Sequence, residues 1–105
     1  MNLRQSPFTT KGLSMSLILV AYDKHPGRDY AELLAALRAY RTYWNHLDSF
    51  WLINTDEAAE QIRDALWILM DSNDELLVMD ISVTAAAWEG INDSGSKWLE
   101  KYFTG

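Results

Sequence analysis

An uninterrupted apolar run, Ser16–Asp23, constrains the fold of this chain more than any other segment. Its residues are apolar or β-branched with no polar alternation, a pattern typical of a strand that is buried on both faces of a sheet. The run stops at a carboxylate, Asp23, and residues 24–27 (KHPG) then favour a turn. We therefore predict a central strand over residues 16–23, with Asp23 at its exit from the sheet.

The spacing of apolar residues predicts two helices after this strand. In residues 29–41, apolar side chains recur at intervals of three and four, which is helical spacing. A second stretch with the same spacing ends at Met70 and follows the candidate N-cap residues 54–56. Each helix is amphipathic, so each is expected to lay one apolar stripe on a sheet.

Three further strands complete the pattern. Residues 42–47 alternate and predict an edge strand, whereas residues 50–53 (FWLI) are unbroken and predict a second interior strand. Asp48 and Ser49 form the turn between them. Residues 75–83 follow a turn-forming sequence and predict the fourth strand.

The order β-α-β-β-α-β predicts an α+β, ferredoxin-like sandwich, a four-stranded antiparallel sheet with two helices on one face. A loop and a short helix over residues 96–103 are expected to follow. Since both interior strands are apolar on both faces, the C-terminal segment or a second subunit must cover the other face, and we predict a homodimer. Residues 15–105 are expected to form this single domain, and residues 1–14 a flexible arm without an assigned function.

Composition narrows the possible partners. The 105 residues include 9 basic and 15 acidic side chains, a net charge of −6, and no cysteine, so disulfides are excluded. An acidic body repels phosphates, which disfavours plain nucleic-acid binding. No apolar run approaches the roughly 18 residues of a membrane span, so we expect a cytoplasmic protein that does not enter a membrane. The many Trp and Tyr residues fit core packing or an aromatic surface for a protein partner.

Asp23 is the main candidate for chemistry. If the two interior strands run parallel and the fourth runs antiparallel to both, Asp23 lies near Asn54, Asp74 and Glu75. The carboxylates of Asp23, Asp74 and Glu75 would then suit Mg²⁺ or Mn²⁺, and such a metal activates water for phosphodiester hydrolysis. The alternative is that Asp23 is a turn residue or pairs with Arg28, in which case no cofactor is expected.

No other motif predicts catalysis. The turn at Asp48 is expected at the end of the sheet opposite Asp23, so His46 is not expected to join it and is interpreted as a packed or hydrogen-bonded edge residue. His25 and His46 without cysteine lack the ligand spacing of zinc sites. The glycines form no phosphate-binding loop, and neither Ser49 nor Ser82 has a paired base.

Four segments carry a resemblance to a known family. They are residues 19–23 (LVAYD), 26–30 (PGRDY), 44–52 (WNHLDSFWL) and 71–78 (DSNDELLV). Over residues 15–102 the chain resembles small ferredoxin-like proteins related to the nuclease-type subunit of CRISPR adaptation, in particular the group labelled SinR-like. The resemblance implies a homodimer with a metal site at the interface between its subunits. Each subunit contributes to this site the carboxylate that ends its first strand, here Asp23.

Three hypotheses follow. The leading one is a small homodimeric binding or regulatory module, in a defence, toxin–antitoxin or phage context, that binds a protein partner through an aromatic surface. Its acidic charge would match a basic partner. The second is a divalent-metal-dependent nuclease of RNA or DNA centred on Asp23, and the third is a structural subunit of a larger assembly.

Overall fold

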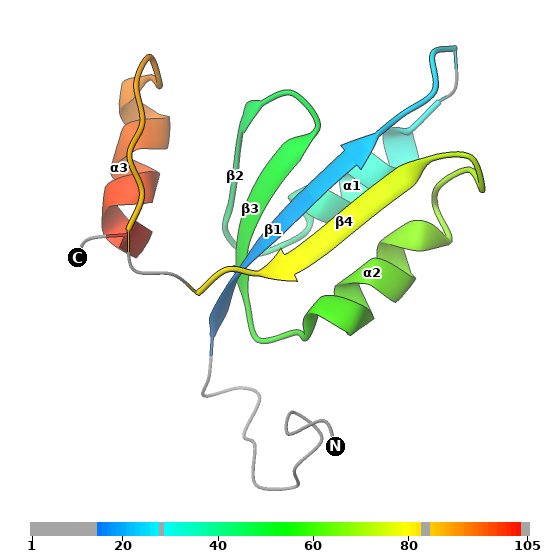
Figure 1. Cartoon of the computed structure of the whole chain (residues 1–105), viewed down its shortest axis with the longest axis horizontal. Coiled ribbons are helices and arrows are strands. Elements are labelled where there is room, and N and C mark those ends of the chain that lie inside the picture. The colour runs from blue at the N-terminus through cyan, green and yellow to red at the C-terminus, as the bar shows by residue number, and fades with distance from the viewer. Residues whose placement is uncertain (1–14, 28, 83–84, 104–105) are drawn as a thin grey trace, which may run out of the picture.

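A computed structural model describes residues 15–27, 29–82 and 85–103. The predicted arm over residues 1–14 and the candidate partner Arg28 lie outside these ranges. The described chain is an α+β fold with a four-stranded antiparallel sheet and three helices (Figure 1). Its elements are β1 (Ser16–Asp23), α1 (Ala31–Arg38), β2 (Tyr43–Leu47), β3 (Phe50–Thr55), α2 (Ala59–Trp67), β4 (Glu75–Asp80) and α3 (Asp93–Phe103).

The strands lie in the order β2-β3-β1-β4, so the predicted central positions of β1 and β3 are confirmed. The expected parallel direction of β1 and β3 is wrong, because these strands pair antiparallel, with Ile18 opposite Ile53. The physical reason is the hairpin between β2 and β3. A tight turn reverses the chain, so β3 runs against β2, and it runs against β1 as well because α1 carries the chain back to the end where β1 began.

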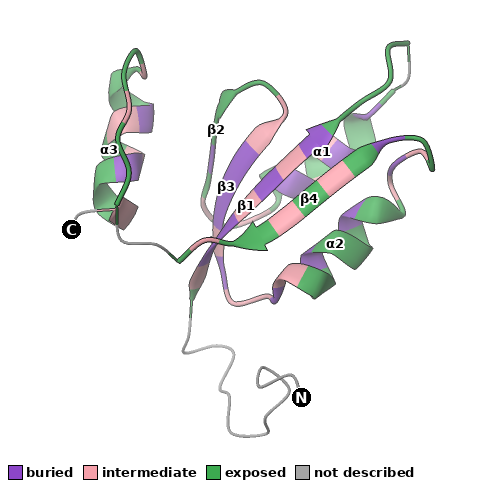
Figure 2. Cartoon of the chain, in the orientation of Figure 1, coloured by how far each residue is buried: buried purple, intermediate pink, exposed green. Residues whose placement is uncertain are grey.

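The larger apolar core lies between the sheet and the helices α1 and α2. Alternate side chains of β1 and β3 point to this face, where Leu33 and Leu37 of α1 and Ile62 and Leu66 of α2 meet them. Both helices therefore cover the same face, as predicted, and the buried stripe along β1 and β3 is visible in Figure 2. The core residues from the strands are Ile18, Val20, Tyr22, Trp51 and Ile53.

The second face of the sheet is covered only in part. Trp44, Leu52 and Leu99 form a smaller core there, between the β2–β3 hairpin and α3. The C-terminal segment is thus one of the two expected covers. It does not reach all of β4, where Leu77 and Met79 are 49% and 44% exposed.

Helix and strand ends differ from the predicted ones because short polar side chains bind the backbone. The carboxylate of Asp29 accepts a hydrogen bond from the Ala31 amide (2.9 Å), and α1 starts there rather than at residue 29. Asp80 binds the amide of Ser82 (3.0 Å) in a turn that ends β4 before the predicted residue 83, which itself lies outside the described ranges. Asn92 accepts from the Gly95 amide (2.9 Å), so α3 begins three residues before the predicted residue 96. None of the described helices is long and apolar enough to cross a membrane.

Candidate functional site

Two of the three predicted metal ligands lie side by side. Asp23 at the end of β1 is opposite Glu75 at the start of β4, and both residues are exposed. They line a shallow hollow of about 300 Å³ together with the ends of the same two strands. Cross-strand neighbours of this kind have Cβ atoms roughly 5 Å apart, so both carboxylates face the same volume of solvent.

The third predicted ligand, Asp74, is held by protein groups. Its side chain is fully buried. One carboxylate oxygen accepts hydrogen bonds from His25 Nδ1 (2.6 Å) and from the hydroxyl of Tyr30 (2.7 Å), and the other accepts from the Asp71 amide (2.8 Å). The Tyr30 hydroxyl also accepts a hydrogen bond from the His25 amide (2.9 Å), so the loop after β1 is tied to the loop before β4.

The Asp74 network favours the ionised carboxylate. Burial raises the pKa of Asp74, but the hydrogen bonds from Tyr30, the Asp71 amide and His25 outweigh burial and lower this pKa from 3.8 to about 2. An ionised carboxylate can only accept hydrogen bonds, so His25 Nδ1 carries a hydrogen and donates it to Asp74. The other ring nitrogen, Nε2, takes no part in this network. The His25 side chain is half-exposed.

The positions of Asn54 and of the turn at Asp48 are the reverse of those expected, because β3 is antiparallel to β1. Asn54 pairs with Leu17 at the far end of β1, so the expectation that Asn54 lies near Asp23 is wrong. The turn between β2 and β3 lies at the Asp23 end instead, where the carbonyl of Ser49 accepts the amide of Tyr22 (3.1 Å). Within the described ranges, no three His, Cys, Asp or Glu side chains are grouped to hold a metal ion.

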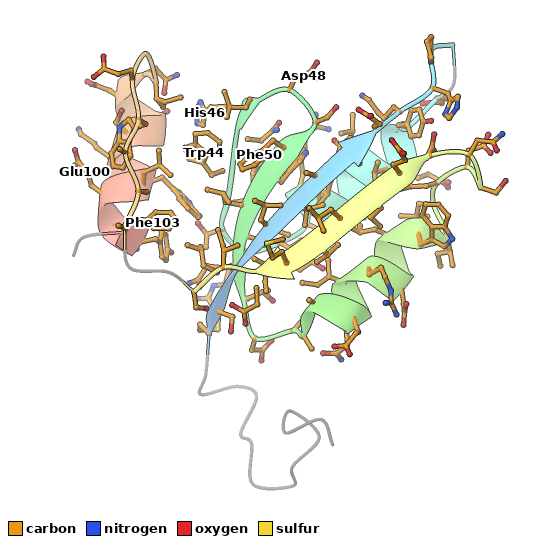
Figure 3. The ribbon with its side chains drawn as sticks, in the orientation of Figure 1. Trp44, His46, Asp48, Phe50, Glu100 and Phe103 are labelled. Atoms are coloured by element: carbon orange, nitrogen blue, oxygen red, sulfur yellow. The ribbon has the colours of Figure 1, made fainter. Side chains whose placement is uncertain are left out.

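An apolar groove lies on the second face of the sheet. It has a volume of about 430 Å³ and lies between the β2–β3 hairpin, α3 and the chain that leads into α3. In Figure 3, Trp44 and Phe103 lie between α3 and the hairpin, Phe50 lies on the hairpin, and Glu100 is on the outer side of α3. The groove is lined by Trp44, Leu47, Phe50, Leu52, Ile81, Ala85, Ala86, Ala87, Trp88, Glu89, Ile91, Leu99 and Phe103.

Two tryptophan indoles fix α3 to β2 and to the residue before it. Trp44 donates its Nε1 hydrogen to the carbonyl of Gly95 (3.0 Å), and Trp98 donates to the hydroxyl of Thr42 (2.8 Å). The absence of a side chain at Gly95 permits this contact. A Cβ atom there would be 2.6 Å from the Ile91 side chain and 3.0 Å from the ring of His46.

His46 is an exposed residue of β2 whose ring packs beside Trp44, with the ring centroids 5.1 Å apart. It therefore fits the interpretation of a packed edge residue, and it supports the docking of α3.

The indole N–H groups of the groove are engaged within the protein. The indole of Trp88 donates to the hydroxyl of Ser96 (3.2 Å), and that of Trp44 is bound to Gly95. Glu89 is the one charged residue among the described residues that line the groove. The site thus offers aromatic and aliphatic surface with a single negative charge, and it suits an apolar group that is neutral or attached to a positive charge.

Comparison of the chain with family models, with curated proteins and with solved structures found no match. Sequence reasoning identified Asp23, Asp74 and Glu75 and an aromatic surface in general, but it missed the groove. Its walls come from segments far apart in the chain, and the only signal was the concentration of Trp and Phe in the hairpin and in residues 88–103.

Proposed function

We propose that this chain is a ferredoxin-like protein-binding module whose groove accepts a large apolar side chain from a basic segment of a partner protein. The observation that carries the proposal is the groove of about 430 Å³, which falls in the size range of ligand sites. The element order β-α-β-β-α-β, the central β1 and β3, and the two helices on one face support the ferredoxin-like assignment.

Aromatic residues in the groove favour a protein partner. Trp44, Phe50, Trp88 and Phe103 present rigid apolar surface on which a partner side chain loses its contact with water. Aromatic residues of this kind dominate the energetics of protein interfaces. The groove is partly open to solvent, and this allows a side chain to enter while its backbone stays outside.

Charge favours a basic partner. The chain carries a net charge of −6, and the charged residue on the groove wall is Glu89. A positive segment is attracted to this surface, and a negative one is repelled. Because exposed charges are screened by salt, the attraction is expected to weaken as ionic strength rises.

Filling the groove is the test of this proposal. Ala86 lines the groove and is exposed, so Ala86→Trp places an indole in the space that a ligand would occupy. We expect this variant to bind the neutral apolar fluorophore N-phenyl-1-naphthylamine at least about tenfold more weakly than the wild type, a loss of roughly 1.4 kcal/mol. Ala35→Trp is the matched control, because Ala35 is an exposed residue of α1 on the other side of the sheet.

Charge preference is measured by competition with the same fluorophore. Two short peptides with identical tryptophan and leucine content are compared, one with lysine and one with glutamate at all other positions. The lysine peptide is expected to displace the fluorophore at a concentration about tenfold lower. Equal displacement by both peptides, or unchanged fluorophore binding by Ala86→Trp, would contradict the proposal.

A second candidate function is a divalent-metal-dependent nuclease, favoured by the pairing of Asp23 with Glu75. Two adjacent carboxylates fit the oxygen ligands of Mg²⁺ or Mn²⁺, although a complete site needs retained waters or a further ligand. The resemblance to the CRISPR-adaptation nuclease group, itself a proposal, points to the same residue. In that case Asp23 and Glu75 would hold the ion, and the ion would supply the activated water.

Cleavage of labelled RNA and double-stranded DNA in the presence of Mn²⁺ tests the nuclease. If it operates, Asp23→Ala abolishes cleavage, whereas Asp64→Ala, which removes an exposed carboxylate from α2, retains it. Absence of cleavage by the wild type, or equal cleavage by the wild type and Asp23→Ala, would exclude Asp23 as the centre of such an activity.

A further inference from the structure

The N-terminal segment, residues 1–14, joins the described chain beside one wall of the groove. The carbonyl of Leu17, the second residue of β1, accepts a hydrogen bond from the amide of Ile81 (2.8 Å), and the Leu17 amide donates to the Ser82 hydroxyl (3.4 Å). Ile81 lines the groove. In Figure 1, the start of β1 accordingly lies beside the end of β4. The chain that precedes β1 is therefore attached next to the groove.

The composition of the N-terminal segment matches the kind of ligand that the groove favours. Residues 1–14 contain Arg4 and Lys11 and no acidic side chain, whereas the rest of the chain carries 7 basic and 15 acidic residues. Phe8, the only aromatic residue of the segment, stands between the two basic ones. The segment thus combines a large apolar side chain with positive charge, and the groove combines aromatic walls with the negative charge of Glu89.

We propose that the groove binds the N-terminal segment of its own chain, with the Phe8 ring as the apolar group that enters. This inference rests on the proposed function, because it takes the same groove and names a ligand for it. An extended chain spans roughly 3.3–3.6 Å per residue, so the chain from Phe8 to Ser16 covers up to about 29 Å. Because Ile81 both contacts Leu17 and lines the groove, this length is sufficient for Phe8 to reach it.

The covalent connection favours this occupant over a separate protein. A ligand joined to its site by a short length of chain has an effective concentration on the order of millimolar, whatever the concentration of the protein. A separate partner must displace Phe8 before its own side chain enters, so its apparent affinity is lower than its affinity for the empty groove. The N-terminal segment is in this way an internal competitor, and partner binding releases it.

Engineered cysteines test the contact directly, because the chain contains none of its own. Thr9→Cys, beside Phe8, and Ala86→Cys, on the groove wall, are introduced together, and disulfide formation in the full chain is followed by the loss of free thiols. The disulfide is expected to form within one chain at least about threefold faster than in the same protein with Phe8→Ala. Equal rates would overturn the proposal. A cross-linked product of twice the mass would place the segment in the groove of another copy, which would also overturn it.

Fluorophore binding separates this inference from the proposed function. N-phenyl-1-naphthylamine competes with Phe8 for the groove, so the full chain with Phe8→Ala should bind it at least about threefold more tightly than the wild type. Thr10→Ala is the matched control and should bind it as the wild type does, and circular dichroism checks that all the variants fold alike. Unchanged binding by Phe8→Ala, together with weaker binding by Ala86→Trp, would overturn the internal ligand and leave the groove proposal intact. Unchanged binding by Ala86→Trp would overturn both.

Discussion

Replacement of Trp51 by alanine is expected to lower the free energy of unfolding by about 3–5 kcal/mol. The Trp51 side chain is 1% exposed and lies on β3 in the centre of the core beneath α1 and α2. Its removal leaves a cavity in a tightly packed interior, so the cost includes lost burial as well as lost contacts. For a domain of this size, such a loss is a large part of the total stability.

Two further variants separate the causes. Trp51→Phe retains most of the volume but removes the hydrogen bond from Nε1 to the Tyr22 hydroxyl (2.9 Å), so it should cost less than the alanine variant. Trp67→Ala removes the same side chain from a position that is 39% exposed, and its effect should be much smaller. All three are compared by urea unfolding, followed by circular dichroism. Equal losses for the Trp51 and Trp67 alanine variants would contradict the described core.

Removal of the Asp74 charge is expected to destabilise the protein at neutral pH and to flatten its stability profile in acid. The pKa of Asp74 is lower in the folded chain, about 2, than its ordinary value of 3.8. The folded state therefore holds the carboxylate charged where the unfolded chain begins to protonate it. This stabilisation is complete above about pH 4 and is lost as the pH falls toward 2.

Asp74→Asn is the variant that tests the network. The amide keeps the size of the side chain but cannot accept from His25, Tyr30 and the Asp71 amide as an ionised carboxylate does. Urea midpoints measured from pH 7 to pH 2 should fall more steeply for the wild type than for this variant. Asp64→Asn changes an exposed carboxylate and should retain the wild-type slope. Parallel profiles for the wild type and Asp74→Asn would show that Asp74 is not the group responsible.

The interior of the sheet was predictable because its signal is local. Residues 16–23 and 50–53 are unbroken apolar runs. A strand of this kind is stable only in the interior of a sheet, where both of its faces are covered. The helices were predictable from their spacing for the same reason. Their ends were not, since short hydrogen bonds such as that from the Ala31 amide to Asp29 decide where a helix starts.

Strand direction and the groove depended on contacts between distant segments. The error in the direction of β3 relative to β1 moved Asn54 away from Asp23 and brought the Ser49 turn toward it. The sequence indicated a carboxylate cluster, but it did not show that His25 and Tyr30 bind Asp74 across 49 and 44 residues. Residues 85–92 have no period at all, so the wall that they contribute to the groove had no local signal.

The docking of α3 by Trp44 and Trp98 has a thermodynamic consequence. One wall of the groove consists of Leu99 and Phe103 of α3, so the groove exists only while this helix is seated against β2. A ligand in the groove and the seated helix therefore stabilise each other by the same free energy, whichever is considered first. A change at Thr42 or Gly95, which accept the two indole hydrogen bonds and do not line the groove, therefore lowers the apparent affinity of the groove without touching a residue that contacts the ligand.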